Sequence, residues 1–269
     1  MGNLVAWFSA LLAIGLPFVA FAWFVHVLER IGQRQLAQRF GWKSVMWTGW
    51  LGTPIHELSH VVMCWLFRHR VDEVALFEPD EKSGRLGYVR HSYRSKSWFE
   101  ELGNPFIAIA PLIGGSLILL MLVNVFFGET ASSVEFNGAA LDGQRQSNLF
   151  QPVRNVLGLV FRPEHFATFK FWVFVYLVLC VGSHMAPSRS DYQGAGKGAL
   201  MITALIVIAT IALGVLSQPP PDLVSRVIEF LSPLFAMFIT IGTLLGFATL
   251  IISMLVQIFP QRYVVRHYK

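Results

Sequence analysis

Long apolar segments alternate with short polar connections along the whole chain. Six of these segments approach the roughly 20 consecutive apolar residues that a helix needs to cross a bilayer. They cover residues 4–28, 44–67, 104–127, 166–185, 199–216 and 231–259. The pattern predicts an all-α polytopic membrane protein with about six transmembrane helices, in which residues 1–269 form a single integral membrane domain.

The composition supports a membrane protein and argues against a nucleic-acid-binding one. Of the 269 residues, 54% are hydrophobic and only 14% are charged, although the formal net charge is +5. The Lys and Arg residues lie in short connections and do not form a basic stripe interleaved with aromatic side chains. We therefore expect the lipid bilayer as a partner, and no nucleic acid.

The basic residues also predict an orientation. Lys and Arg are more frequent in the connections 68–103 and 184–198 and the end 260–269 than in the connections on the other side. Because cytoplasmic loops carry an excess of these residues, both termini are expected in the cytoplasm, as in a protein of the bacterial inner (cell) membrane. The first apolar segment has no basic region before it and no small-residue cleavage site after it, so we expect a retained helix.

One connection has the pattern of strands. Residues 71–93 read VDEVALFEPDEKSGRLGYVRHSY, in which two β-prone runs flank a turn-rich stretch. This predicts a small β-hairpin. An exposed strand edge can bind an extended peptide, and a hairpin with no substrate role is the other interpretation.

Two histidines and a glutamate interrupt the second apolar segment. His56, Glu57 and His60 form the pattern HELSH, an HExxH motif. On a helix, residues four apart lie on one face, so the two imidazoles can bind one metal ion and Glu57 can act as the general base. The residue types predict a Zn²⁺ site that activates water. Buried histidines that bond to the backbone, or that line a proton path, are the alternative.

A catalytic zinc needs a third protein ligand and an open position. The candidates are Asp191 and His184, which flank Pro187 after the fourth segment, and Asp142 in a polar loop. The HELSH motif lies near the end of its segment, on the side that receives the connection with Asp191 and His184, whereas Asp142 lies on the other side. A helix cap is a second interpretation of Asp191.

The remaining small and sulfur-containing residues are interpreted as packing residues. Cys64 and Cys180 lie in apolar runs and form no disulfide or CxxC pattern. Small residues and prolines open the third segment, where they favour a kinked entry and close helix packing; they are Asn104, Pro105, Pro111, Gly114 and Gly115.

Four stretches together resemble the site-2 protease family (M50-like) of intramembrane zinc metalloproteases. They are HELSH at 56–60, the hairpin at 71–93, NPFIAIAPLIGG at 104–115 and APSRSDYQG at 186–194. The resemblance implies a metalloprotease-like core at about 44–198, with extra helices at 4–28, 199–216 and 231–259. It also implies that Asp191 is the third metal ligand. The family's Leu-Asp-Gly is absent there and occurs literally at 141–143, so His184 and Asp142 stay open.

Motif and resemblance together predict a zinc-dependent endopeptidase that cleaves a membrane-embedded or membrane-adjacent peptide. The expected partners are a membrane protein or peptide as substrate and a regulatory membrane partner. The alternatives are a membrane zinc protease of another fold that uses His184, or a non-proteolytic membrane protein that handles metal or protons as a transporter or assembly partner.

Overall fold

The computed structural model describes residues 23–131, apart from 25, 29, 33, 36 and 39, and residues 158–216, apart from 189. The predicted helix at 231–259, most of that at 4–28, and the loop with Asp142 lie outside the described residues.

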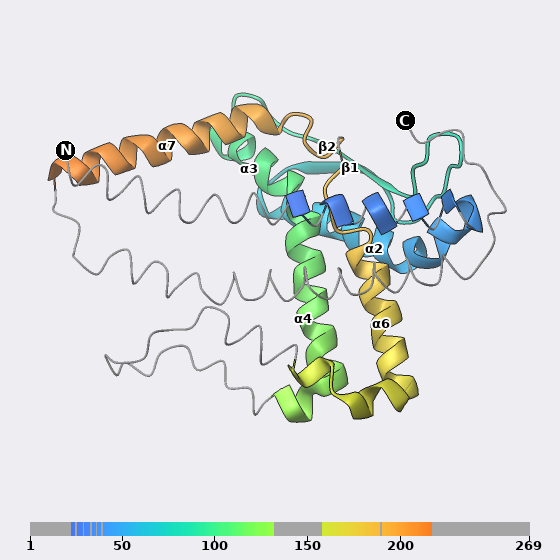
Figure 1. The fold of residues 1–269 in the computed structure, drawn as a ribbon. Helices are drawn as coiled ribbons and strands as arrows, with labels where there is room; N and C mark the ends of the chain where they lie inside the picture. The colour runs from blue at the N-terminus through green and yellow to red at the C-terminus, as the bar shows by residue number, and fades with distance from the viewer. Residues whose placement is uncertain are drawn as a thin grey trace, which may run out of the picture.

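The described chain is mostly helical, with one small antiparallel sheet (Figure 1). Both features were predicted from the sequence. The elements follow in the order α2 (Trp42–Leu66), β1 (Arg70–Ala75), β2 (Tyr88–Ser92), α3 (Trp98–Ala108), α4 (Ala110–Ala131), η1 (Pro163–Ala167), α6 (Phe169–Gly182) and α7 (Ala195–Leu216).

One stretch of the described residues, Ala110–Gly128 in α4, is long and apolar enough to cross a membrane by length and composition. Two shorter apolar helical stretches are Phe169–Gly182 and Ala195–Leu205. The number of transmembrane helices therefore stays a prediction from the sequence.

The segment at 104–127 was predicted as one apolar span with a kinked entry at its prolines. It belongs to two helices, α3 and α4, that are separated at Ile109. The physical reason is Pro111, which has no backbone N–H and therefore cannot donate to the carbonyl of Ile107. Pro111 instead lies in the first turn of α4, where a missing N–H costs little. The break leaves the Ile107 carbonyl free for another donor.

The hairpin pairs Val71 with His91 and Ala75 with Tyr88, and its register shifts between Val71 and Glu73. A well-formed turn joins it to α2. Arg68 has the left-handed value φ 61°, the N–H of His69 donates to Cys64 O at 2.8 Å, and the N–H of Arg68 donates to Trp65 O at 3.2 Å. This is a Schellman motif, which satisfies the last carbonyls of a helix and reverses the chain.

Helices α4 and α6 run side by side, and α2 crosses them at the end where α4 begins and α6 finishes (Figure 1). Buried apolar side chains from α4 and α6 form the core between them. Glycines allow the crossing. A Cβ on Gly52 of α2 would lie 2.0 Å from Cys180 O, and one on Gly114 of α4 would lie 2.0 Å from Ser59 Oγ. The close packing predicted for Gly114 is therefore present.

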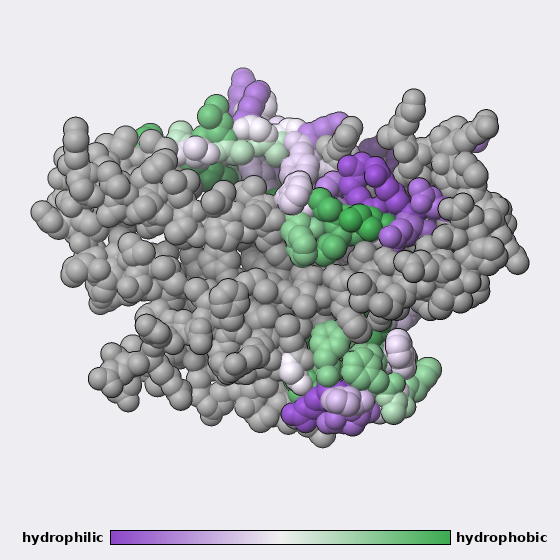
Figure 2. Space-filling view, viewed as in Figure 1, coloured by the Kyte–Doolittle hydropathy of each residue, from purple (hydrophilic) through white to green (hydrophobic). Residues whose placement is uncertain are grey.

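Apolar side chains also cover the outer faces of α4 and α6. Figure 2 shows apolar residues in the lower part of the view, where these helices lie, and hydrophilic residues gathered at their far end. Large apolar side chains of α4 and α6 that are exposed in the described structure are Leu117, Met121, Val125, Phe169, Trp172 and Tyr176.

The crossing predicts that Gly52→Ala destabilises the protein. The added methyl must push α2 away from the backbone of α6, and overpacking of this kind costs about 1–3 kcal/mol. Thermal unfolding of the purified protein in detergent, followed by circular dichroism, measures the change.

Gly128→Ala is the matched control, because a Cβ there meets nothing within 4 Å and alanine is the better helix former. We expect its stability to be equal to or higher than that of the wild type. Equal unfolding temperatures for Gly52→Ala and the wild type would contradict the close crossing.

Candidate metal centre

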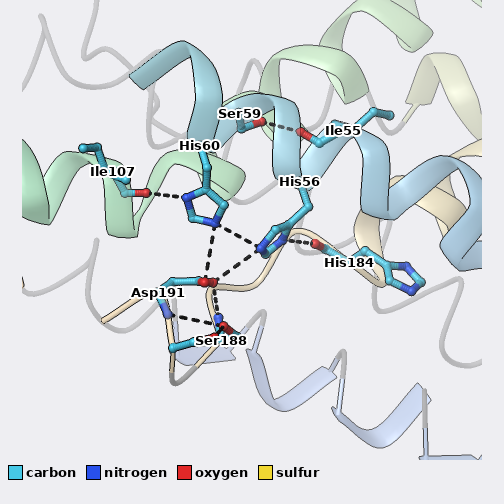
Figure 3. Close-up of polar contacts among 9 residues, drawn as sticks. Ile55, His56, Ser59, His60, Ile107, His184, Ser188 and Asp191 are labelled. Carbon is cyan, nitrogen blue, oxygen red and sulfur yellow. Dashed lines mark hydrogen bonds and ion pairs between the residues drawn. The ribbon is translucent and has the colours of Figure 1, made fainter. Parts of the chain in front are cut away.

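Three side chains from two distant parts of the chain converge beside α2 (Figure 3). The Nε2 atoms of His56 and His60 lie 3.2 Å apart. Asp191 reaches both rings, with Oδ2 3.4 Å from His56 Nε2 and Oδ1 3.6 Å from His60 Nε2. His60 is buried, and His56 and Asp191 are partly buried. The structure thus brings Asp191 to the two histidines.

Backbone carbonyls orient both imidazole rings. His56 Nδ1 lies 2.6 Å from His184 O, and His60 Nδ1 lies 2.8 Å from Ile107 O. Because a carbonyl can only accept, each Nδ1 carries the proton that it donates. In the neutral rings both Nε2 atoms then carry lone pairs, and these face each other and the carboxylate of Asp191. Such an arrangement of acceptors suits a cation between them.

Two prolines make these carbonyls available. Pro111 removes the N–H that would otherwise bond to Ile107 O within a helix. Pro187 disfavours a helical conformation at Ala186, and α6 ends at Gly182, before His184. The carbonyls of Ile107 and His184 therefore lack helical partners, and the two histidines supply the donors.

A tight turn positions Asp191. The N–H of Ser188 donates to Asp191 Oδ2 at 2.6 Å, and α7 begins only at Ala195 after Gly194 at φ 85°. The interpretation of Asp191 as the cap of the next helix is therefore wrong. Burial raises the pKa of Asp191, but the imidazoles of His56 and His60, when protonated, outweigh it and hold that pKa below its ordinary range. In that state the carboxylate is ionised.

The spacing of the donor atoms matches a metal site. Ligands about 2.0–2.1 Å from a tetrahedral ion lie roughly 3.3 Å from one another. The two Nε2 atoms lie 3.2 Å apart, and each lies near a different oxygen of Asp191, at 3.4 Å for His56 and 3.6 Å for His60. One ligand atom from each of the three residues lies within 4.8 Å of the other two. These three residues could hold a metal ion and would leave a fourth position open. A second group in the described residues with this ability contains Cys64, His69 and His91.

Glu57 follows the first histidine on α2 and is buried, with 7% of its surface exposed. Within the described part of the chain its carboxylate makes no hydrogen bond or ion pair. A buried carboxylate that is not committed to a partner next to a metal ligand is available to accept a proton.

His184 contributes its backbone and not its ring. The imidazole points away from the group in Figure 3, and its Nδ1 lies 2.9 Å from Ser183 Oγ and 3.2 Å from Cys180 O. Its use as a metal ligand is therefore not supported by the geometry, and Asp142 lies outside the described residues. The sequence analysis did not predict that the backbone carbonyls of Ile107 and His184 bind the two histidines. Pro111 and Pro187 could have indicated this, because each proline interrupts a helix close to one of these carbonyls.

The geometry predicts that Asp191→Ala lowers the metal content by one equivalent per chain, because only two donor atoms remain. Metal content is measured by mass spectrometry after purification in detergent. His184→Ala keeps the metal, because the substitution removes the ring and preserves the carbonyl that holds His56.

Asp191→Ala also removes a side chain that supports a local turn, and Asp80→Ala is the control for this effect. The carboxylate of Asp80 also supports a local turn, accepting from Lys82 N at 3.0 Å and from Ser83 Oγ at 2.7 Å, but Asp80 does not belong to the metal group. Its metal content should equal that of the wild type. Full metal content in Asp191→Ala would remove this residue from the group.

Comparisons of the chain with models of protein families, with curated proteins and with solved structures found no match.

Proposed function

We propose that this protein is a zinc-dependent endopeptidase that cleaves peptide within or next to a membrane. The observation that carries the proposal is the convergence of two imidazole lone pairs and one carboxylate oxygen beside α2, with a buried glutamate between the histidines in sequence. These three residues would leave a fourth position for water on a bound zinc ion, as in catalytic zinc sites.

The donor set supports zinc as the ion. Two neutral imidazoles and one carboxylate are a common ligand set of hydrolytic zinc sites. Each histidine donates the N–H of Nδ1 to a backbone carbonyl, which leaves Nε2 for the metal. Such contacts orient metal-binding imidazoles and raise their basicity. Asp191 is in turn fixed by the N–H of Ser188.

Glu57 is the residue that moves the proton. A bound zinc ion acts as a Lewis acid on a peptide carbonyl and lowers the pKa of water to about 7. Glu57 accepts the proton of the attacking water as the new carbon–oxygen bond forms. It then donates that proton to the departing amine nitrogen as the carbon–nitrogen bond breaks.

The apolar surface supports a membrane location for the substrate. α4 contains a stretch of 19 residues that could cross a bilayer, and large side chains such as Val125 and Phe169 are exposed on α4 and α6. A peptide bond within hydrocarbon must be freed from its helix and reached by water before it can be cleaved. We therefore infer a polar path to the metal group, and a substrate segment that unwinds locally.

The hairpin is a candidate site for the unwound segment. Because the sheet has two strands, β1 and β2 each have one edge without a partner strand within the sheet. An extended peptide can add to such an edge through backbone hydrogen bonds. We also propose that another membrane protein binds this protein and regulates the cleavage.

The proposal predicts that Glu57→Gln keeps the metal and loses peptide cleavage. The amide fills the same space but cannot take the proton, and general-base catalysis is typically worth about 10²–10⁴-fold in rate. The measurement compares new protein N-termini in membranes of cells that produce either the wild type or the variant. Termini within or beside transmembrane segments should appear with the wild type only.

Glu101→Gln is the matched control, because Glu101 is buried to a similar degree on α3 and does not belong to the metal group. It should produce the same termini as the wild type. An unchanged set of termini with Glu57→Gln would exclude Glu57 as the base, and would favour the non-proteolytic alternative of metal or proton handling.

A further inference from the structure

A second set of donor atoms converges at the end of α2. Ligand atoms of Cys64, His69 and His91 all lie within 4.8 Å of one another. Cys64 and His69 are buried and His91 is partly buried. This group shares no residue with the group of His56, His60 and Asp191.

The turn after α2 brings two of these residues together. The Schellman motif folds the chain back, so that the N–H of His69 donates to the carbonyl of Cys64 at 2.8 Å. The hairpin supplies the third residue, because His91 on β2 pairs with Val71 on β1, two residues after His69. Three different elements therefore contribute one donor each.

The ring of His69 is held with a lone pair toward His91. Its Nε2 lies 2.8 Å from Glu100 O and therefore carries the proton, which leaves the lone pair of a neutral ring on Nδ1. His69 Nδ1 lies 3.0 Å from His91 Nδ1. The ring also stacks on Tyr93, with centroids 4.9 Å apart and an angle of 21° between the planes.

The carbonyl that holds His69 is itself fixed. The carboxylate of Glu100 accepts from Arg94 N at 2.6 Å and from Arg94 Nε at 2.8 Å, and Ser97 caps the first turn of α3 at the same place. The contact from an imidazole to an anchored carbonyl repeats the arrangement of His56 and His60. Metal-binding histidines have such outer contacts in general.

We propose that Cys64, His69 and His91 form a second zinc site, which ties the end of α2 to the hairpin. One thiolate and two imidazoles suit zinc among the available divalent ions. On binding, the Cys64 thiol releases its proton to water and the sulfur bonds to the metal. The three ligands come from α2, the turn after it and β2, so a bound ion would hold these elements together, with water in the fourth position. The proposal does not depend on proteolysis.

The competing explanation is an N–H···N hydrogen bond between His69 and His91, with Cys64 as a packing residue. Cobalt distinguishes the two explanations, because Co²⁺ replaces zinc and a cobalt–thiolate bond produces a charge-transfer absorption in the near ultraviolet. The group of His56, His60 and Asp191 has no sulfur, so it does not produce this band.

The experiment loads the purified full-length protein with Co²⁺ and records its spectrum and its metal content. The wild type should bind two equivalents and show the thiolate band. Cys64→Ser should lose the band and one equivalent. Cys180→Ser, which removes the other free buried cysteine, should keep both.

Two further variants test the proposal even if the Cys64→Ser protein does not fold. His91→Gln should lose one equivalent and weaken or lose the band, whereas His56→Ala should lose one equivalent and keep the band. Absence of the band in the cobalt-loaded wild type overturns the proposal without any variant. Persistence of the band in Cys64→Ser also overturns it.

Discussion

Two hydrogen bonds from imidazole to backbone determine how the rest of the site is arranged. They run from His56 to the carbonyl of His184 and from His60 to the carbonyl of Ile107. Each bond places the proton on Nδ1 and turns the Nε2 lone pair toward Asp191. Each also joins α2 to another element, one to the chain after α6 and the other to the end of α3. The same two contacts therefore define the chemistry of the site and connect the helices around it.

The sequence predicted the parts of the site that depend on local spacing. The separation of four residues between His56 and His60 places them on one helix face, and the turn residues of 71–93 predicted the hairpin. Asp191 was chosen as the third ligand from the family resemblance and from the side of the membrane on which its connection was expected. No local sequence pattern links it to His56 and His60, which lie more than a hundred positions away. The structure brings these three side chains together, whereas the bound metal and the protease activity remain proposals.

The sequence did not predict the features that depend on broken helices and on tertiary contacts. The prolines of 104–127 predicted a kinked entry, but the apolar pattern continues through Ile109, so hydrophobicity alone cannot reveal that the chain forms two separate helices there. Cys64 was interpreted as a packing residue, because its partners His69 and His91 do not form a familiar ligand spacing with it. The chain reversal that brings His69 back to Cys64 was also hard to predict, because the left-handed residue at such a turn is normally glycine and here it is Arg68. These contacts become visible only when the chain reversal is known.

The most direct test of the central claim is the X-ray absorption spectrum of zinc bound to the Cys64→Ser protein, in which the sulfur ligand of the second group is removed. The account predicts a first shell of nitrogen and oxygen at about 2.0–2.1 Å, with the outer-shell scattering of two imidazoles, and the loss of this spectrum in His60→Ala. Zinc without imidazole scattering, or no bound zinc in a folded protein, would contradict the assignment of His56, His60 and Asp191 as the metal centre.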